Sequence, residues 1–484
     1  MRNLVGAALL VATVASCKQS DLNITNPNQA TVAGAASDPN AFQLLVTGLQ
    51  SDFRGNRGGI QGQMTIIGRE SYTFNPQEGR TVTNALLGIQ AGNKTELDPG
   101  GFATGPWFGP YSALRNIFNF KNTINASTTL SAAGKAASLG FAQTLESAAL
   151  MDIVENKDSL GGITQILADA SQLAPFVSRD SMYHYILNTL DAGATNLAAG
   201  GAAFPFTLGP GYAGFNTPTT FAQFNRAFKA RASAWYATYG GGATAWAACL
   251  AALQASFMNA AATTRAALDV GVYATYGPSP DVNNGQGASN NTTTYAHMSF
   301  LTDAQKKADG VTLDDRFTSK TRTLPSRQAP PTGAGPTTGT STLGFNIWPT
   351  VSSSIAFIRN EELILLRAEA ELATGNAAGA IADINTIRVN SGGLPPTTLT
   401  ASSTTSAILH GILYEKRYSL MMEGHRWMDM RRYGLLGELP LDITSGPNKN
   451  FVAIVIPIPV AECLVRAKVT GNLLGPNGLN DCAP

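Results

Sequence analysis

The densest group of chemically capable side chains lies at 413–434, LYEKRYSLMMEGHRWMDMRRYG. Eight of these 22 residues are charged, whereas 13% of the whole chain is charged. A histidine, carboxylates and arginines at helical spacing could form either an acid–base centre or a set of ion pairs. Glu423 and Arg426 are three residues apart, as are Asp429 and Arg432, and such pairs usually form salt bridges on or between helices. We therefore interpret the stretch as a structural network rather than a catalytic site.

The middle of this stretch contains a histidine and a glycine side by side. His425 stands four residues before Asp429, so the two would pair if one helix ran through both. Gly424 is expected to interrupt that helix. Trp427 and Tyr433 would cover apolar surface beside the ion pairs.

Motifs typical of enzymes are missing from the rest of the sequence. The four histidines are scattered, without an HExxH pair or the Cys/His spacing of a zinc site. The sequence GPGYAG at 209–214 matches G-x-G-x-x-G, but it follows no predicted strand and opens no helix, so it indicates a glycine-rich loop. Glu361 and Glu362 would point in different directions on a helix, so together they do not make a two-carboxylate glycosidase site. We expect no enzymatic activity, no metal and no cofactor.

Aromatic residues beside polar, loop-forming segments predict a binding face. A flat ring can stack on the C–H face of a sugar while polar neighbours bind the hydroxyls of the sugar. The alternative for any one ring is that it packs in the hydrophobic core. Trp107 follows a glycine-rich segment, Phe74 lies near Arg69, and Tyr295 flanks an irregular segment. We predict ligand contacts at these four residues. Further rings of the same kind are Tyr72, Phe108, Tyr212, Phe215, Tyr273, Tyr276 and Trp348.

The N-terminus, MRNLVGAALLVATVASC, reads as a lipoprotein signal. A short basic segment precedes an apolar stretch that is too short to span a membrane and fits a signal peptide over 1–16. Val14–Cys17 matches the bacterial lipobox, in which the cysteine is acylated and anchors the chain to a membrane; an ordinary signal peptide with a chance cysteine is the alternative. Lys18, rather than aspartate, after Cys17 favours the outer membrane. A polar tether over 17–30 follows.

Composition narrows the class of protein further. The chain has 484 residues, a net charge of +1 and 49 glycines. This balance argues against nucleic acid as a partner, because phosphate binding needs a concentrated basic face. After the N-terminal segment there is no apolar run of the roughly 18 residues that a membrane span needs.

In an exported chain Cys463 and Cys482 could pair, although the sequence does not determine the pairing. Cys249 is interpreted as a buried apolar residue.

Helical periodicity must supply the framework for these residues. Gly375-Asn376 joins two predicted helices, and Ala368, Gly375 and Ala380 give the pair the small-residue pattern of a tetratricopeptide repeat. Clusters of Pro, Gly, Asn, Thr and Ser predict long irregular structure over 276–350, which is usually functional when it is ordered. The predicted helices cover 107–125, 132–155, 179–197, 221–240, 244–261, 358–374, 377–389 and 404–423, and an extended segment covers 450–462.

Two segments resemble the SusD/RagB family of nutrient-binding lipoproteins. IAFIRNEELILLRAEAELATGNAAGAIADINTIRVNSGG is similar to the helical hairpin of that family, and 413–434 is similar to its EGHRW-x-DLRRWG signature. Ser419 departs from the pattern, because the family usually has glutamate there. We expect the signature to be structural and separate from the ligand contacts. Its residues are Glu415, Arg417, Glu423, Arg426, Asp429 and Arg432.

The resemblance implies a mainly α fold, an α–α superhelix of tetratricopeptide-like repeats that supports a loop-rich ligand face. It implies a lipid-anchored protein, exposed at the surface of the outer membrane, that binds oligosaccharides or peptides. It further implies a SusC-like TonB-dependent transporter as partner, with this chain as its lid. The alternatives are a glycan-acting hydrolase and a protein-interaction scaffold. We expect one family domain over 31–484, divided into a helical part (31–275), a loop-rich segment (276–350), the repeat and signature (351–435) and a C-terminal extension (436–484).

Overall fold

The computed structural model describes most of the chain, and several expectations lie outside the described part. The signal peptide, Cys17, the tether up to residue 30 and Cys482 are among the residues outside it. None of the described helices is both long and apolar enough to cross a membrane. The described residues are 32–74, 82–88, 96–169, 171–279, 281–287, 292–328, 339–446 and 449–470.

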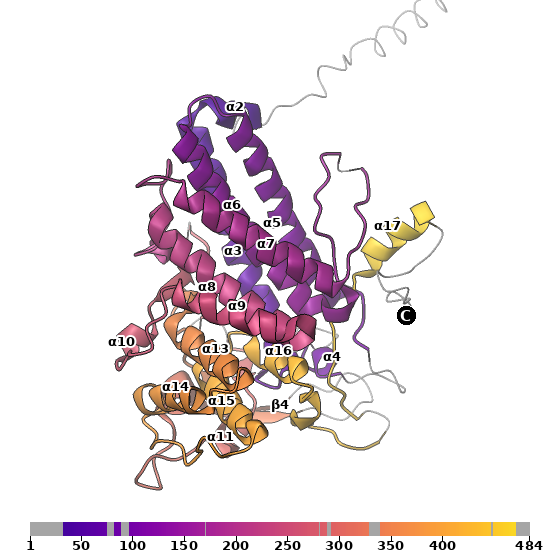
Figure 1. Cartoon of the computed structure of the whole chain (residues 1–484). Helices are drawn as coiled ribbons and strands as arrows, with labels where there is room; N and C mark the ends of the chain where they lie inside the picture. The colour runs from indigo at the N-terminus through magenta and orange to yellow at the C-terminus, as the bar shows by residue number, and fades with distance from the viewer. Residues whose placement is uncertain are drawn as a thin grey trace, which may run out of the picture.

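Consecutive antiparallel helices form the upper part of the molecule in Figure 1, coloured indigo to magenta. Each helix from α5 to α9 packs on the next one along the chain, and α3 packs on α5. The order of α5 to α9 follows the predicted helices closely, and each apolar face packs on the preceding helix even where a longer connection, such as 158–178 or 199–217, joins the two. The bounds are α2 Val32–Ser37, α3 Pro39–Ile67, α4 Val82–Leu86, α5 Gly101–Ala126, α6 Ala132–Lys157, α7 Arg179–Ala198, α8 Pro218–Tyr236 and α9 Gly242–Gln254, with short helical turns Asp158–Leu160, Pro210–Tyr212 and Ala237–Gly241.

Local signals in the sequence fix where these helices begin and how closely they pack. The Ser131 and Ser178 side chains each cap a helix by accepting a backbone N–H bond three residues on. Gly140 of α6 faces α7, and a Cβ there would lie 2.8 Å from the carbonyl oxygen of Gly193. The two backbones therefore approach more closely than a larger residue would allow.

The longest helix, α3, was not predicted. Its sequence contains five glycines, each of which disfavours a helix by about 1 kcal/mol relative to alanine. Seven of its apolar residues nevertheless recur at spacings of three, four and seven, so they form one face. These seven are buried, whereas Leu44 lies off this face and is exposed, and the packing of the face outweighs the local propensity. The seven are Phe42, Val46, Leu49, Phe53, Ile60, Met64 and Ile67.

A second helical group, orange to yellow in Figure 1, forms the lower part of the molecule. Its central helix α13 packs against α8, α9, α14 and α15, which joins the two groups. Gly375 ends α13 with a φ of 88°, as expected for the turn of the helical pair. The bounds are α13 Asn360–Ala373, α14 Ala377–Asn390, α15 Thr405–Ser419, α16 His425–Arg432 and the short turn Leu436–Glu438.

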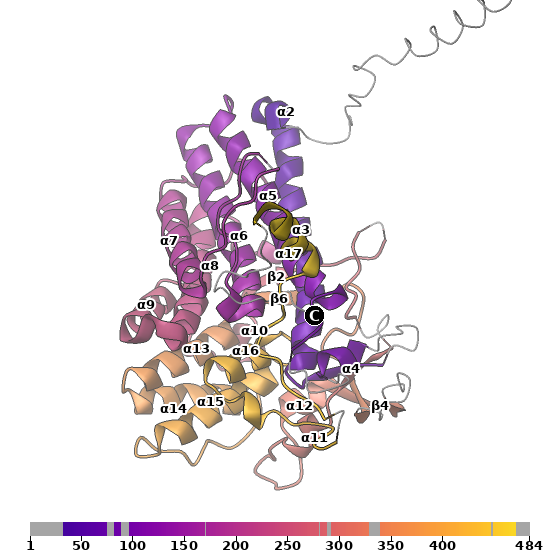
Figure 2. The same cartoon turned by 90° about the vertical axis from the view of Figure 1, so that its right-hand side faces the viewer.

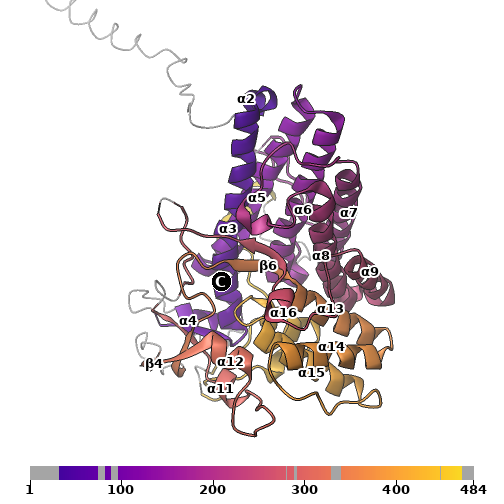
Figure 3. The same cartoon turned by 90° about the vertical axis from the view of Figure 1, so that its left-hand side faces the viewer.

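The segment expected to be irregular, 276–350, contributes strands and short helices to the side opposite α14 and α15 (Figures 2 and 3). A four-stranded antiparallel sheet has the order β1-β3-β5-β4, and a separate two-stranded ribbon pairs β2 with β6 so that Tyr273 lies opposite Ala356. The strands are β1 Ser71–Thr73, β2 Gly271–Ala274, β3 Thr294–Ala296, β4 Thr321–Gln328, β5 Thr340–Phe345 and β6 Ile355–Arg359; the short helices are α10 Arg265–Leu268, α11 Ser299–Thr302 and α12 Asp315–Lys320.

The expectation of a mainly α fold built from packed helical pairs is confirmed. The extended segment predicted at the C-terminal end is present, but it passes into a helix, α17 Val460–Thr470. Cys249 is buried with a free thiol, as expected, and Cys463 is in a disulfide. The division of 31–484 into four parts stays a prediction.

Candidate functional site

A polar cleft of about 890 Å³ opens beside the β2–β6 ribbon. Its walls come from segments far apart in the sequence, which the antiparallel pairing of β2 with β6 and the packing of α12 against α15 bring together. Its lining comes both from the 276–350 segment and from the end of α14. The lining residues are Arg265, Asp269, Tyr273, Asp315, Arg316, Thr318, Ser319, Lys320, Asn346, Ile347, Trp348, Ser353, Ser354, Ala356, Arg359, Asn390, Ser391 and Glu423.

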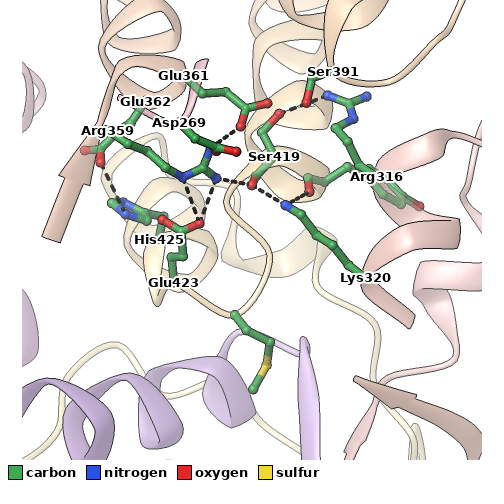
Figure 4. A network of polar contacts seen from close by, with 12 residues as sticks. Asp269, Arg316, Lys320, Arg359, Glu361, Glu362, Ser391, Ser419, Glu423 and His425 are labelled. Carbon is green, nitrogen blue, oxygen red and sulfur yellow. Dashed lines mark hydrogen bonds and ion pairs between the residues drawn. The ribbon is translucent and has the colours of Figure 1, made fainter. Parts of the chain in front are cut away.

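The floor of the polar cleft is an ion-pair network centred on Arg359 (Figure 4). Arg359 is 3% exposed and pairs with Glu361 and, at 2.7 Å, with Glu423. It also donates to the carbonyl oxygen of Ser419. Arg265, on the wall, lies 3.3 Å from the Glu361 carboxylate. Removing one member would leave a buried charge without its partner, so the network holds the floor rigid.

Electrostatics keep most of this floor ionised. Burial alone would lower the pKa of Arg359, but the carboxylates of Glu423 and Glu361 hold that pKa well above its usual value. Burial would raise the pKa of Glu361, whereas Arg359 and Arg265 hold it well below the usual value. Lys320 differs, because its amine donates to the carbonyl oxygens of Tyr418 and Ser419 and burial lowers its pKa to about 7.

The rim of the polar cleft is suited to bind a hydroxylated ligand. Thr318, Ser319 and Asn346 are exposed, and Tyr273 is half-buried with its hydroxyl bonded to the Asp269 carbonyl oxygen. Hydroxyl and amide groups can both donate to and accept from sugar hydroxyls, while a ring supplies apolar contact. Among the described residues, no group of three or more His, Cys, Asp and Glu side chains could hold a metal ion.

The four predicted ligand residues lie elsewhere, with buried side chains. Arg69 is fully buried and donates to the backbone carbonyls of Ile67, Leu87, Pro440 and Phe451. Burial lowers its pKa to about 10, and its φ of 59° places it in the left-handed region. Its guanidinium therefore ties together four segments of backbone.

The other three are aromatic and are 1–2% exposed. Phe74 and Tyr295 lie together, with ring centroids 5.3 Å apart, whereas Trp107 packs on Tyr111 and Phe176 at another place in the core. None of the four lines the polar cleft. A ligand-binding role for them stays a prediction.

The signature 413–434 does not form all the pairs that its spacing suggested. Asp429 and Arg432 are 2.8 Å apart, as expected. Glu423 instead pairs with Arg359, and the nearest carboxylate to His425 is that of Glu362, at 3.8 Å. For Glu423 the reason is local: Gly424 has a φ of 83° and α16 begins only after it, so Glu423 does not share a helix with Arg426. His425 and Asp429 do share α16, but Asp429 pairs with Lys416 and Arg432 instead.

Charged side chains of the signature are otherwise held in the interior by helices outside it. Glu415 pairs with Arg316 of α12 at 2.6 Å and with Arg388 of α14 at 2.8 Å. Arg417 reaches Asp303 at 2.6 Å. Glu423 lines the polar cleft, so this residue of the signature lies at the candidate site, and the separation of the signature from the ligand contacts stays a prediction.

Tyr273 and Trp348 were among the rings expected on a binding face, but most other residues of the polar cleft were missed because no motif marks them. Thr318, Ser319, Lys320 and Asn346 come from the 276–350 segment, so the length of that loop-rich segment was the available signal. The other wall, from α10 and the end of α14, reaches the cleft only through tertiary packing.

Comparisons with known proteins point to one family and one fold. Residues 258–463 match the model of the SusD family. A SusD-like protein of Bacteroides fragilis has 17% identity and a TM-score of 0.65, with 90% of this chain and 96% of that chain covered. NanU of B. fragilis has 13% identity and a TM-score of 0.64, covering 91% and 97%. A SusD-like carbohydrate binding protein of B. fragilis has 14% identity and a TM-score of 0.63, covering 89% and 99%. A comparison with curated proteins gave no match.

Proposed function

Since residues 258–463 match the model of the SusD family and the chain has the fold of SusD-like proteins, we propose that it binds oligosaccharides in the polar cleft. The cleft supports this proposal by its size, its exposed hydroxyl and amide side chains, and the ring of Tyr273 on its wall. A solved structure with this fold is described as a carbohydrate binding protein, in agreement with the proposal.

The charges of the polar cleft favour an uncharged ligand. Arg265 is bonded twice to Asp269, at 2.7 Å, and Asp315 pairs with Lys307 at 2.5 Å. Charged groups at the rim are thus already compensated within the protein. A neutral glycan can hydrogen-bond to them without the desolvation of an additional charge.

Delivery to a membrane transporter completes the proposed function. The lipobox cysteine, Cys17, would anchor the chain at the outer membrane, exposed at the cell surface. The chain would act as the lid of a SusC-like TonB-dependent transporter and pass the glycan to it.

We propose a binding protein rather than an enzyme. The charged groups of the cleft floor are bonded to one another, and Arg359, the residue at their centre, is buried. A general acid must instead reach the scissile bond with a proton to give. A glycan-acting hydrolase and a protein-interaction scaffold are the alternatives.

A blocking substitution tests the site. Ser319 is exposed on the rim, so Ser319→Trp places an indole in the polar cleft without disturbing the core. The matched control is Ser402→Trp, at an exposed serine between α14 and α15. We expect the wild type and the control to be retarded in native gels that contain plant or host polysaccharides, and Ser319→Trp to lose at least about tenfold in affinity.

Two other results would contradict the proposal. Equal retardation of both tryptophan variants by the same polysaccharide would place the ligand outside the polar cleft. Release of reducing ends from the polysaccharide by purified wild type, abolished in a carboxylate variant, would favour the hydrolase.

A further inference from the structure

A smaller cavity lies on the other side of the β2–β6 ribbon from the polar cleft. Its volume is about 380 Å³, and we refer to it as the side pocket. Neighbouring residues of a strand point to opposite faces, which explains why Ala356 lines the polar cleft and Phe357 lines the side pocket. Tyr273 contributes to both walls.

One wall of the side pocket is a polar stripe of α3. Gln43, Thr47, Gln50 and Arg54 follow one another at intervals of four, three and four residues, so they share one helix face. The opposite wall is the loop at 207–212. The aromatic side is formed by Tyr276, which is half-buried and donates its hydroxyl hydrogen to the carbonyl oxygen of Arg54.

Hydrogen bonds across the side pocket hold its walls in place. The Gln43 amide accepts from the Thr207 backbone N–H at 2.8 Å and donates to the carbonyl oxygen of the same residue at 3.1 Å. The Gln50 amide oxygen accepts from the Gly209 N–H at 2.8 Å. The side pocket is therefore already formed without a ligand, which reduces the entropy lost on binding.

An ion pair at the end of the stripe has two donor groups, the buried Nε and the Nη2 of Arg54, and one acceptor left over. Arg54 Nη1 donates to the Thr275 carbonyl oxygen at 3.1 Å and to Asp281 Oδ1 at 3.0 Å. Asp281 Oδ1 also accepts from the Val282 N–H. Arg54 Nη2 and Asp281 Oδ2 have no partner within the described part of the chain.

The chemistry of this pair matches two neighbouring hydroxyls. A hydroxyl can donate to the free carboxylate oxygen and another can accept from the free guanidinium N–H₂, both as charge-assisted bonds. The Val282 N–H and the Arg54 side chain lower the pKa of Asp281, so its carboxylate stays an acceptor at neutral pH. The two charges cancel, which favours a neutral ligand over an ionic one.

We propose that the side pocket is a second sugar site, in which one neutral pyranose ring bridges Arg54 and Asp281 through adjacent hydroxyls. The volume is at the lower end of the range for small-molecule sites, which suits a single ring or chain end rather than a long chain. The proposal takes only its ligand class from the proposed function. The polar cleft and the side pocket would bind independently.

Saturation-transfer NMR with methyl glycosides of glucose, galactose and mannose tests the side pocket. The experiment uses the Ser319→Trp protein, so that the polar cleft is blocked. We expect at least one glycoside to give a signal, and Asp281→Asn added to that protein to weaken its binding about tenfold. The control is Asp191→Asn, because Asp191 pairs with Arg226 at 2.8 Å with a similar exposure of 50% against 47% for Asp281. Thr47→Phe, which fills the exposed end of the side pocket, should abolish the signal.

The outcomes separate the two proposals. A signal that persists in both Asp281→Asn and Thr47→Phe would overturn the side pocket, as would its absence from the Ser319→Trp protein when wild type gives it. Polysaccharide retardation of wild type, lost in Ser319→Trp, would uphold the polar cleft whichever way the glycoside experiment falls. A glycoside signal without any polysaccharide binding would uphold only the side pocket.

Discussion

Replacing Glu369 by glutamine should break a buried four-residue ion-pair network. Glu369 of α13 is 1% exposed and lies 2.7 Å from Lys416 of α15; it also pairs with Arg432 of α16. Asp429 lies 2.8 Å from each of the same two cations. Two carboxylates thus balance two cations. Glu369→Gln keeps the shape and leaves one buried positive charge in excess.

The magnitude can be worked from the pKa of Glu369. Although burial would raise it, Arg432 and Lys416 lower it from the usual 4.5 to about 2. This shift corresponds to about 3 kcal/mol of stability at neutral pH. A buried ion pair broken on one side typically costs about 3–5 kcal/mol, in agreement. We expect Glu369→Gln to lower the free energy of unfolding by about 3 kcal/mol.

Urea unfolding followed by circular dichroism measures this loss as a lower transition midpoint. The control is Glu371→Gln, two positions along the same helix, where the side chain is 17% exposed and its carboxylate lies 3.9 Å from Arg367. A weak, partly exposed pair contributes less than about 1 kcal/mol. Equal midpoints for the two variants would refute the reasoning.

The pH dependence gives an independent check of the same network. The pKa of Glu369 is lower in the folded chain, so its stabilisation is fully present above 4.5 and disappears as the pH falls toward about 2. Wild type should therefore lose more stability than Glu369→Gln over that interval. A parallel loss in both proteins would show that Glu369 is not the group responsible.

Two further buried groups and the polar cleft yield testable results. Burial raises the pKa of Glu70 to about 7, so ionisation of Glu70 should destabilise the fold as the pH rises from 4.5 to above 7. In urea unfolding, Glu70→Gln should have the same free energy of unfolding as wild type at pH 4. At pH 8 its free energy of unfolding should exceed that of wild type by about 3 kcal/mol. Burial lowers the pKa of Lys157 to about 7, so thermal stability should rise between pH 7 and 10.5 in wild type and rise less steeply in Lys157→Met, in which Lys320 still titrates over the same interval. Closing the polar cleft with Ser319→Trp should remove polysaccharide binding without changing the thermal midpoint by more than about 2 °C.

Much of the helical framework was predictable because its signals are local. Ser178 is followed by a helix that it caps, Gly375 ends one helix of a pair, and apolar periodicity marks most of the helices. The length of α3 was not predictable, since its five glycines mask an apolar face that is stable only when buried against α5.

The candidate site was less predictable because burial and convergence are tertiary properties. Trp107 and Tyr295 stand beside polar segments in the sequence, yet each is packed into the core. Tyr273 and Asn346 belong to no motif, and they line the same cleft only because tertiary packing brings the β2–β6 ribbon and the residue after β5 together. The pairing of Glu423 with Arg359, rather than with Arg426, likewise depends on a contact 64 residues away along the chain.

The position of Arg359 has a consequence for how ligand specificity could diverge. It is the last residue of β6 and immediately precedes α13, so the cleft floor and the helical array share one rigid joint. Substitutions on that joint would unsettle folding, whereas substitutions at exposed rim positions such as Asn346 and Thr318 would alter only what the cleft recognises. The rim residues therefore both tolerate substitution and determine which ligand is recognised. A new nutrient preference could arise there in few substitutions, while the scaffold beneath stays unchanged.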